Sequence, residues 1–200
     1  MVWDYIIIGQ GIAGTVLSET LIARGKKVLV IDDDSKDNAT KVAAGICNPI
    51  TGRHLSKTWM ADEIFPFLKL FYSNLENKLG IKFFFEKAIY RPFKSIEEQN
   101  QWFGRSMADE WKDFLNTHVA DDEYSKLINN ELGGWETKHS CQIDTTALLE
   151  SYRDFLKGNQ ILKSDEFHHK ELIIHENQID YLDEKANKII FCEGFFGVNC

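Results

Sequence analysis

The chain begins with an apolar run that ends in a cluster of glycines. Residues 5–8, Tyr-Ile-Ile-Ile, are aromatic or β-branched throughout, which predicts a strand buried on both faces of a parallel sheet. After Gly9, apolar residues recur at helical spacing over residues 12–22, and a second apolar run, residues 27–31, ends on Asp32. The pattern therefore predicts a strand, a glycine turn, a helix and a second strand, followed by an acid.

Two further apolar patterns lie later in the chain. Asp144 precedes a stripe of apolar residues at helical spacing, which consists of Leu148, Leu149, Tyr152 and Phe155. We expect Asp144 to cap this helix. Residues 188–194, KIIFCEG, form another unbroken apolar run that ends in Gly194. This run predicts a second buried parallel strand, with Gly194 at its carboxyl end, where open α/β sheets bind ligands.

The middle of the chain has a different pattern and holds most of the aromatic residues. Residues 81–93, IKFFFEKAIYRPF, predict an extended strand, and residues 96–115 predict a helix. Residues 133–144, GGWETKHSCQID, predict another strand that leads into the Asp144 helix. We interpret residues 51–140 as a domain inserted between the early and the late parts of the first domain.

Composition narrows the classes of partner. The chain has 200 residues, of which 44% are hydrophobic and 27% charged, as is usual for a globular protein. Its formal net charge of -8 argues against binding to nucleic acid or to anionic membrane surfaces, because those partners attract basic proteins. Small molecules are the expected ligands, and the sequence carries no signal for an oligomeric state.

Cysteine usage and the absence of targeting signals suggest a location. The four cysteines, Cys47, Cys141, Cys192 and Cys200, are scattered without the spacing of a metal site or a disulfide framework. We therefore expect reduced thiols and no bound metal. No signal peptide opens the chain, and no apolar run approaches the roughly 20 residues that cross a bilayer. These features predict a cytoplasmic protein.

The three glycines of the opening segment have the spacing G-x-G-x-x-G, typical of dinucleotide binding. Gly9 permits the tight turn, Gly11 lets the backbone approach a pyrophosphate, and Gly14 allows the helix to pack closely on the strand. The first turn of the helix, which includes Ile12 and Ala13, would offer free N–H groups to the phosphates.

The acid after the second strand indicates how the nucleoside is held. Asp32 can accept hydrogen bonds from both ribose hydroxyls, and its charge would repel a 2′-phosphate. Asp33 is the neighbouring candidate. The motif alone does not separate NAD from FAD.

The segment after Asp32 favours FAD. A nicotinamide-binding half would continue with a helix and a third parallel strand, whereas this chain enters the polar stretch DDSKDNATK and then VAAGICNPITGRH. Ala43, Ala44 and Gly45 leave little side chain to obstruct a flat ligand.

These segments resemble a known family. DYIIIGQGIAGTVLSETLIARGKKVLVID followed by KVAAGICNP is similar to the beginning of the FAD-dependent oxidoreductases of the D-amino-acid oxidase and glycine oxidase family. Residues 141–157 and 186–197 resemble two later segments of the same family. The resemblance implies that residues 43–45 and Ile46 lie along the flavin and its pyrophosphate, and that the turn at Gly194 returns to the cofactor.

The resemblance also implies a fold class and a reaction. The expected fold is α/β, with a Rossmann-like FAD-binding domain formed by residues 1–50 and 141–200 and an inserted α+β substrate domain formed by residues 51–140. Members of the family oxidise a small amine or amino acid by hydride transfer to flavin N5. They usually continue beyond the turn matched by Gly194, so we expect either the N-terminal part of a longer enzyme or a shortened relative.

Candidate substrate residues lie after the small-residue segment. Arg53, His54 and Lys57 could bind a carboxylate or tune the charge near flavin N1, although a polar loop with solvated charges has the same composition. No side chain is a convincing catalytic base, and no G-x-S-x-G segment supports a hydrolase. Two alternatives remain open, which are an NAD-dependent dehydrogenase and a non-catalytic nucleotide-binding module.

Overall fold

The computed structural model describes four stretches of the chain, which are residues 1–35, 38–51, 56–116 and 122–199. Contacts between Cα atoms divide the chain into two compact units. The first unit comprises Met1–Gly45, Leu79–Phe83 and Asp144–Cys200, and the second comprises Ile46–Lys78 and Phe84–Ile143. The chain thus passes between the units after Gly45, Lys78, Phe83 and Ile143, and the expected boundaries after residues 50 and 140 lie near the first and the last of these points.

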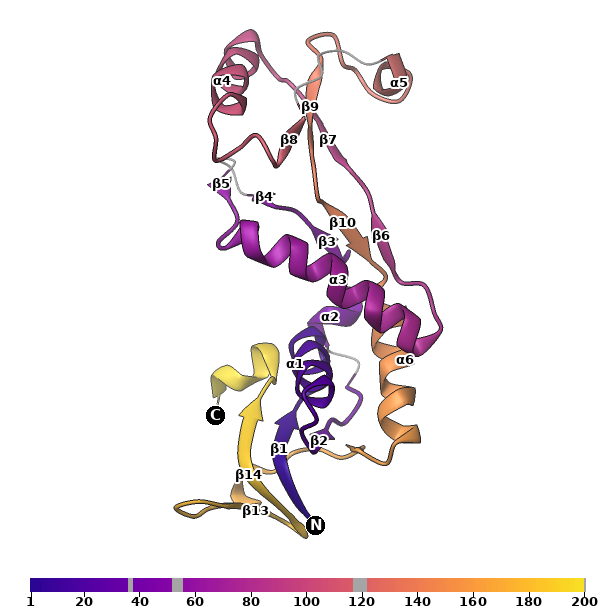
Figure 1. The fold of residues 1–200 in the computed structure, drawn as a ribbon, viewed down its shortest axis with the longest axis vertical. Helices are drawn as coiled ribbons and strands as arrows, with labels where there is room; N and C mark the ends of the chain where they lie inside the picture. The colour runs from indigo at the N-terminus through magenta and orange to yellow at the C-terminus, as the bar shows by residue number, and fades with distance from the viewer. Residues whose placement is uncertain (36–37, 52–55, 117–121, 200) are drawn as a thin grey trace. The chain divides into compact units, whose positions relative to one another are not determined.

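The first unit is built on a mixed six-stranded sheet (Figure 1). In spatial order its strands are β11 (Leu162–Lys163), β2 (Val28–Ile31), β1 (Val2–Ile8), β14 (Glu184–Phe191), β13 (Ile179–Tyr181) and β12 (Leu172–Ile174). Strand β1 pairs in parallel with both β2 and β14, and β11 is parallel to β2. The hairpin of β12 and β13 continues the sheet in the antiparallel sense.

The central strands form where the apolar runs predict them. All four residues of β2 are buried, as are the last three residues of β1. Burial on both faces of a parallel sheet explains why these runs show no alternation of polar and apolar side chains. The prediction that residues 188–194 include a parallel strand is confirmed, because β14 pairs with β1 from Val2↔Lys185 to Ile8↔Phe191. The predicted burial of this run is wrong, since Ile189 and Ile190 are only half-buried and Lys188 and Phe191 are exposed.

Two helices of this unit confirm the helical patterns. Helix α1 (Ile12–Ala23) directly follows the glycine turn, and α6 (Thr145–Gly158) begins after Asp144, whose Oδ1 accepts a hydrogen bond from the Ala147 N–H at 2.9 Å. The predicted apolar stripe of α6 is buried, apart from the half-buried Phe155. A short helix, α2 (Ala39–Val42), is capped by the Asn38 side chain.

In its described residues, the second unit contains three small sheets and two longer helices (Figure 1). Its sheets are β3 (Ile46–Cys47), β10 (Cys141–Ile143) and β6 (Phe84–Glu86); β4 (Ile50–Thr51) and β5 (Ser56–Lys57); and β7 (Ile89–Pro92), β9 (Gly134–Thr137) and β8 (Leu115–Asn116). The helices are α3 (Ala61–Leu79), α4 (Ile96–Ser106) and the short α5 (Asp122–Ser125). Its aromatic core includes Phe65, Phe93, Trp102, Trp111, Phe114 and Trp135.

The helix predicted over residues 96–115 is wrong in its second half, because α4 ends at Ser106. Trp102 and Trp111 are nine residues apart, so a continuous helix would place them about half a turn apart, on opposite faces. Instead the chain folds through tight turns after Ser106, and both rings enter the same core with their centroids 6.3 Å apart. Packing of aromatic side chains therefore overrides local helical periodicity.

Two predicted strands are divided in the structure. The strand expected over residues 81–93 forms β6 and β7, which belong to different sheets. The strand expected over residues 133–144 forms β9 and β10, and His139 between them has a positive φ of 62°. This left-handed conformation interrupts an extended chain.

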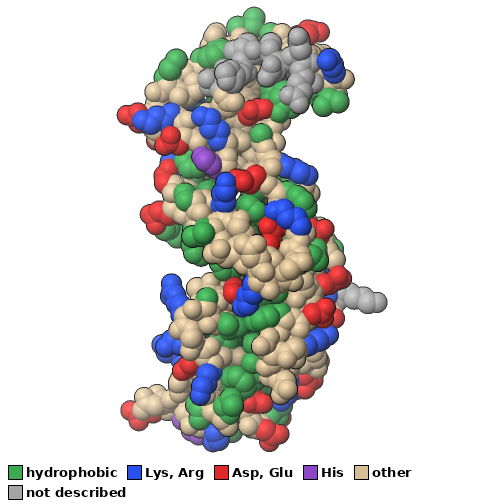
Figure 2. Space-filling view, turned by 45° about the vertical axis from the view of Figure 1, so that its right-hand side comes forward, with side chains coloured by type: hydrophobic (Ala, Val, Ile, Leu, Met, Phe, Trp, Pro, Cys, Tyr) green, Lys and Arg blue, Asp and Glu red, His purple; other side chains and the backbone are tan. Residues whose placement is uncertain are grey.

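Charged side chains of both signs are interspersed over the face shown in Figure 2. Within the part of the chain that the structure describes, no helix has the length and apolar character needed to cross a membrane.

Candidate cofactor site

The glycine turn joins β1 to α1 at the carboxyl end of the central strands. The Gly9 N–H donates to the Ile31 carbonyl at 2.8 Å, and Gly9 has φ +94°. A Cβ on Gly9 would lie 2.6 Å from the Cys192 carbonyl oxygen, and one on Gly14 would lie 1.9 Å from the Gly9 carbonyl oxygen. These distances leave no room for a side chain, so the fold itself requires glycine at both positions.

Gly11 differs from these two glycines. A Cβ there would have the Thr40 Oγ1 atom as its nearest neighbour, at 3.3 Å, followed by the Asn38 side chain at 3.7 Å. Within that range it would meet two hydrogen-bonded side chains and no backbone atom, since Thr40 accepts from the Ile12 N–H and Asn38 accepts from the Thr40 N–H. The described fold therefore tolerates a Cβ at Gly11 much better than at Gly14.

The amino end of α1 retains free backbone donors. Gly11 is the N-cap residue and provides no side-chain hydrogen bond. The Ile12 N–H donates to Thr40 Oγ1 at 3.1 Å, and the Thr15 N–H donates to the Gly11 carbonyl at 2.9 Å. Between them, the N–H groups of Ala13 and Gly14 have no acceptor among the residues that the structure describes. Such groups attract anions at a helix amino end.

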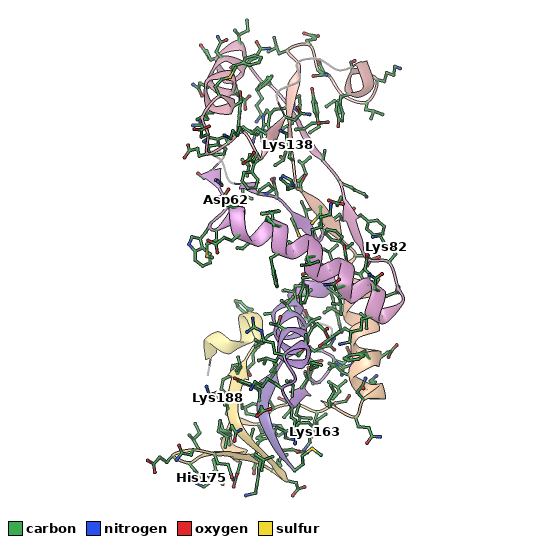
Figure 3. The ribbon with its side chains drawn as sticks, viewed as in Figure 1. Asp62, Lys82, Lys138, Lys163, His175 and Lys188 are labelled. Carbon is green, nitrogen blue, oxygen red and sulfur yellow. The ribbon has the colours of Figure 1, made fainter. Side chains whose placement is uncertain are left out.

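Asp32 lies directly after β2, beside the glycine turn. Its Oδ2 accepts from the Gln10 N–H at 2.7 Å, and its Oδ1 accepts from Arg153 Nη1 at 2.5 Å and from the Asp34 N–H at 3.0 Å. Its own N–H donates at 3.1 Å to the carbonyl of Lys163, which Figure 3 labels on β11. A carboxylate has about four acceptor positions, so about one, on Oδ2, has no donor among the residues that the structure describes.

Asp33 is oriented differently. It is exposed, and its Oδ1 accepts from the Ser35 N–H at 3.0 Å. The side chain thus stabilises the local turn after β2. Asp34, the next residue, pairs with Lys41 at 2.8 Å. The hydrogen bond from Lys41 lowers the pKa of the Asp34 carboxyl, partial burial opposes this effect, and the charge of Arg153 adds to it.

The sequence interpretation did not identify Arg153, which proves to be a central residue of the site. It lies on α6 with only 7% of its surface exposed. Helical spacing in the sequence could have identified it, because Arg153 follows Leu149 by four residues and therefore shares the buried face of the helix. Gln10 was also missed, although it is 3% exposed and lies between the first two glycines of the motif.

The small-residue segment lies open in the first unit. Ala43 and Ala44 are exposed, and Gly45 has φ +67°. The Thr145 hydroxyl at the beginning of α6 donates to the Ala43 carbonyl at 3.3 Å, which fixes this segment to the helix. Ile46 begins β3 and belongs to the second unit.

The return turn ends β14 beside the glycine turn. The Cys192 N–H donates to the Ile8 carbonyl at 2.7 Å, so the ends of β14 and β1 are adjacent. Gly194 comes next with φ +61°, and no atom lies within 4 Å of a Cβ built there. The turn is therefore open on that side, within the described residues.

The substrate candidates are only partly covered by the structure, because Arg53 and His54 lie outside the described residues. Lys57 is fully engaged within the second unit. Its ammonium bonds to Asp62 at 2.7 Å and to the Glu110 carbonyl at 3.1 Å, and it lies 4.7 Å from the centroid of the Phe114 ring. Figure 3 labels Asp62 at the beginning of α3. We conclude that Lys57 anchors the beginning of this helix.

The sequence profile of a family described as FAD dependent oxidoreductase matches residues 4–197. The chain belongs to this family. Its cofactor is therefore FAD, which decides between the two dinucleotides that the glycine motif left open.

Solved structures of several oxidases share the fold. Glycine oxidase from Bacillus cereus is 18% identical, with a TM-score of 0.70 over 94% of this chain and 55% of that one. Glycine oxidase from Geobacillus kaustophilus is 14% identical, with a TM-score of 0.71 over 95% and 55%. Iminodiacetate oxidase from Chelativorans is 19% identical, with a TM-score of 0.63 over 94% and 54%. The chain spans about half the length of these proteins.

One curated protein from another class also shows a partial match. SsrA-binding protein from Mycoplasmopsis fermentans is 31% identical over an alignment of 86 positions, which covers 38% of this chain and 56% of that protein. The family match, in contrast, extends over nearly the whole chain.

Proposed function

We propose that the first unit holds the adenosine diphosphate part of FAD at the glycine turn. Three features support this assignment. Among the described residues, the N–H groups of Ala13 and Gly14 are free to bind a pyrophosphate oxygen, Gly11 presents no side chain beside them, and Asp32 keeps about one acceptor position on Oδ2. The acceptor position on Oδ2 suits a ribose hydroxyl. The strongest support for the assignment comes from the free N–H groups at the amino end of α1.

The open small-residue segment is the proposed contact for the remainder of the cofactor. Ala43 and Ala44 are exposed and carry only methyl groups, so a flat ring system can approach their backbone. Because Thr145 holds the Ala43 carbonyl, the segment is fixed to α6 in the first unit. The open side of Gly194, next to the end of β14, is the second proposed contact.

We further propose that the whole protein oxidises a small amine or amino acid, with the second unit on the substrate side. Bound FAD would supply the redox chemistry, which in this proposal is hydride transfer from the carbon that carries the nitrogen to flavin N5. The residues of this chain bind and orient the cofactor. The family match supports the oxidoreductase assignment, and the names of the related structures, glycine oxidase and iminodiacetate oxidase, support the substrate class.

The reaction can be tested with the full-length protein. Anaerobic mixing with a panel of small amino acids and secondary amines should bleach the flavin absorbance with at least one compound, and oxygen or an artificial acceptor should restore it. A panel of 2-hydroxy acids is the comparison. Reduction by hydroxy acids alone would contradict the amine assignment, and bound FAD that no donor reduces would favour a non-catalytic nucleotide-binding module.

A further inference from the structure

Helix α6 carries a buried guanidinium beside the proposed ribose site. The side chain of Arg153 is 9% exposed and that of Asp32 is 12% exposed. A charge with so little access to water needs an opposite charge and hydrogen-bond partners. Arg153 has both, because Nη1 bonds to Asp32 Oδ1 at 2.5 Å and to Gln10 Oε1 at 3.0 Å. Its Nη2 bonds to the Asp32 carbonyl at 3.1 Å and to Ser164 Oγ at 3.4 Å.

Gln10 completes the network from the side of the glycine turn. Its backbone N–H donates to Asp32 Oδ2 at 2.7 Å, and its side-chain amide donates to the Leu149 carbonyl at 2.9 Å. The same side chain accepts the bond from Arg153. The turn after β1, the end of β2 and helix α6 are thus joined at one carboxylate.

This network limits how the Asp32 carboxylate can rotate. Arg153 occupies Oδ1 while Gln10 occupies one position on Oδ2, so the two oxygens have fixed and different surroundings. The direction from which the free acceptor position on Oδ2 can accept a hydrogen bond is consequently fixed. A carboxylate fixed in this way binds a hydroxyl without first losing rotational freedom.

We propose that Arg153 is a positioning residue for the ribose of FAD, acting through the Asp32 carboxylate. The inference rests on the proposed cofactor site. It assigns a role in that site to helix α6, which is distant in sequence from Asp32 and the glycine turn. The planar fork of arginine is essential to this role. One guanidinium nitrogen bonds to the Asp32 carboxylate and to Gln10, and the other bonds to the Asp32 carbonyl and to Ser164. The single nitrogen of a lysine cannot occupy the places of both guanidinium nitrogens.

The test measures how well the site recognises ribose hydroxyls. The binding of ADP, 2′-deoxy-ADP and 3′-deoxy-ADP to the cofactor-free chain is measured by calorimetry. Hydrogen bonds to charged groups correspond to roughly tenfold or more in affinity. We expect the unmodified chain to prefer ADP by at least about this factor over one of the two deoxy nucleotides, because Asp32 has about one acceptor position left.

The variants are Arg153→Met, which keeps the length and removes the charge, and Arg153→Lys, which keeps the charge and removes the fork. Lys157→Met is the matched control, since Lys157 lies one turn further along the same helix and is exposed. We expect the preference for ADP to fall toward one in Arg153→Met, to fall partly in Arg153→Lys, and to stay unchanged in the control. Circular dichroism and thermal unfolding of the nucleotide-free chains show whether each variant folds.

The possible results distinguish a failure of the proposed cofactor site from a failure of the positioning role of Arg153. An unmodified chain that binds neither ADP nor FAD would overturn the cofactor site and, with it, the role of Arg153. The positioning role alone would be overturned by a different result. In that case the unmodified chain prefers ADP over deoxy-ADP, and a folded Arg153→Lys or Arg153→Met variant prefers ADP by the same factor. If Arg153→Met does not fold, the Arg153→Lys variant decides by itself.

A double substitution tests the route of the effect. In a chain that carries Asp32→Asn, adding Arg153→Lys should not change the ratio of ADP to deoxy-ADP affinity any further, because the carboxylate through which Arg153 acts is already lost. A further fall in this ratio would mean that Arg153 reaches the nucleotide by another route, which contradicts the proposal.

Discussion

Replacing Asp32 with Ala should destabilise the protein even when no cofactor is bound. The substitution removes the carboxylate that bonds directly to Arg153 and leaves a guanidinium, 9% exposed, whose remaining opposite charge is the exposed Asp34 carboxylate at 3.8 Å from Nε. Breaking a buried ion pair from one side costs about 3–5 kcal/mol when the remaining charge is left uncompensated. Because Asp34 compensates part of the Arg153 charge, we expect a loss toward the lower end of this range. The Gln10 and Asp34 N–H groups lose their acceptor as well.

The double variant Asp32→Ala/Arg153→Met separates this effect from the loss of cofactor contacts. It removes both charges, so no unpaired charge remains, and an apolar side chain of similar length fills the space. Replacing a whole buried pair with apolar groups is often neutral or stabilising. We therefore expect the double variant to be more stable than Asp32→Ala, with a higher urea midpoint for unfolding of the FAD-free chain followed by far-UV circular dichroism.

The affinity for FAD should behave differently from the stability. Both variants lack the acceptor for the ribose hydroxyl, which contributes roughly 1.5–3 kcal/mol to binding. Both should therefore bind FAD weakly, whichever is more stable. The reasoning would be refuted if Asp32→Ala were as stable as the unmodified chain, or if the double variant were the less stable of the two.

Four further predictions concern single positions. Gly14→Ala should lower the stability by about 1–3 kcal/mol or more, measured by urea unfolding, because its Cβ would lie 1.9 Å from a backbone oxygen. Gly11→Ala should keep nearly normal stability but lose FAD affinity in a titration; equal losses of stability in both glycine variants would contradict this distinction. Asp144→Ala should cost about 0.5–2 kcal/mol of stability through the lost cap, and Asp144→Asn should restore most of it. The hydrogen bond with Cys141 lowers the pKa of the Cys47 thiol, so iodoacetamide should label the half-buried Cys47 before Cys141 and at lower pH, as followed by mass spectrometry of the separate peptides; earlier labelling of Cys141 would contradict this order.

The sequence predicts the elements whose pattern is local. The strands around the glycine turn, helix α1 and the Asp144 cap were all expected, because each depends on residues within one turn or one strand of each other. Predictions failed where distant residues decide the local conformation. Trp111 leaves the helical path because Trp102 and Trp135 already define an aromatic core, with their rings stacked at a centroid distance of 4.3 Å.

The same contrast holds for the proposed site. The spacing of the glycines and the acid is visible in the sequence because the chain passes directly from one to the other. The partner of the acid is not visible, since Arg153 is 121 residues away from Asp32. Helical spacing places Arg153 on the buried face with Leu149, which indicates a buried charge and hence a partner, but it does not name the partner.

The surroundings of Asp32 explain why cofactor binding and folding are coupled in the first unit. Its carboxylate accepts N–H groups from three places, which are the glycine turn through Gln10, the turn at Asp34 and helix α6 through Arg153. Each donor is held separately, Gln10 by the Leu149 carbonyl and Asp34 by its ion pair with Lys41. A change in any of these elements alters the direction of the remaining acceptor position on Oδ2, and so alters ribose binding without touching the ribose. Conversely, a bound ribose hydroxyl adds a further bond to a carboxylate that joins all three elements, so FAD should stabilise the first unit as a whole, by an amount set by its affinity and its free concentration.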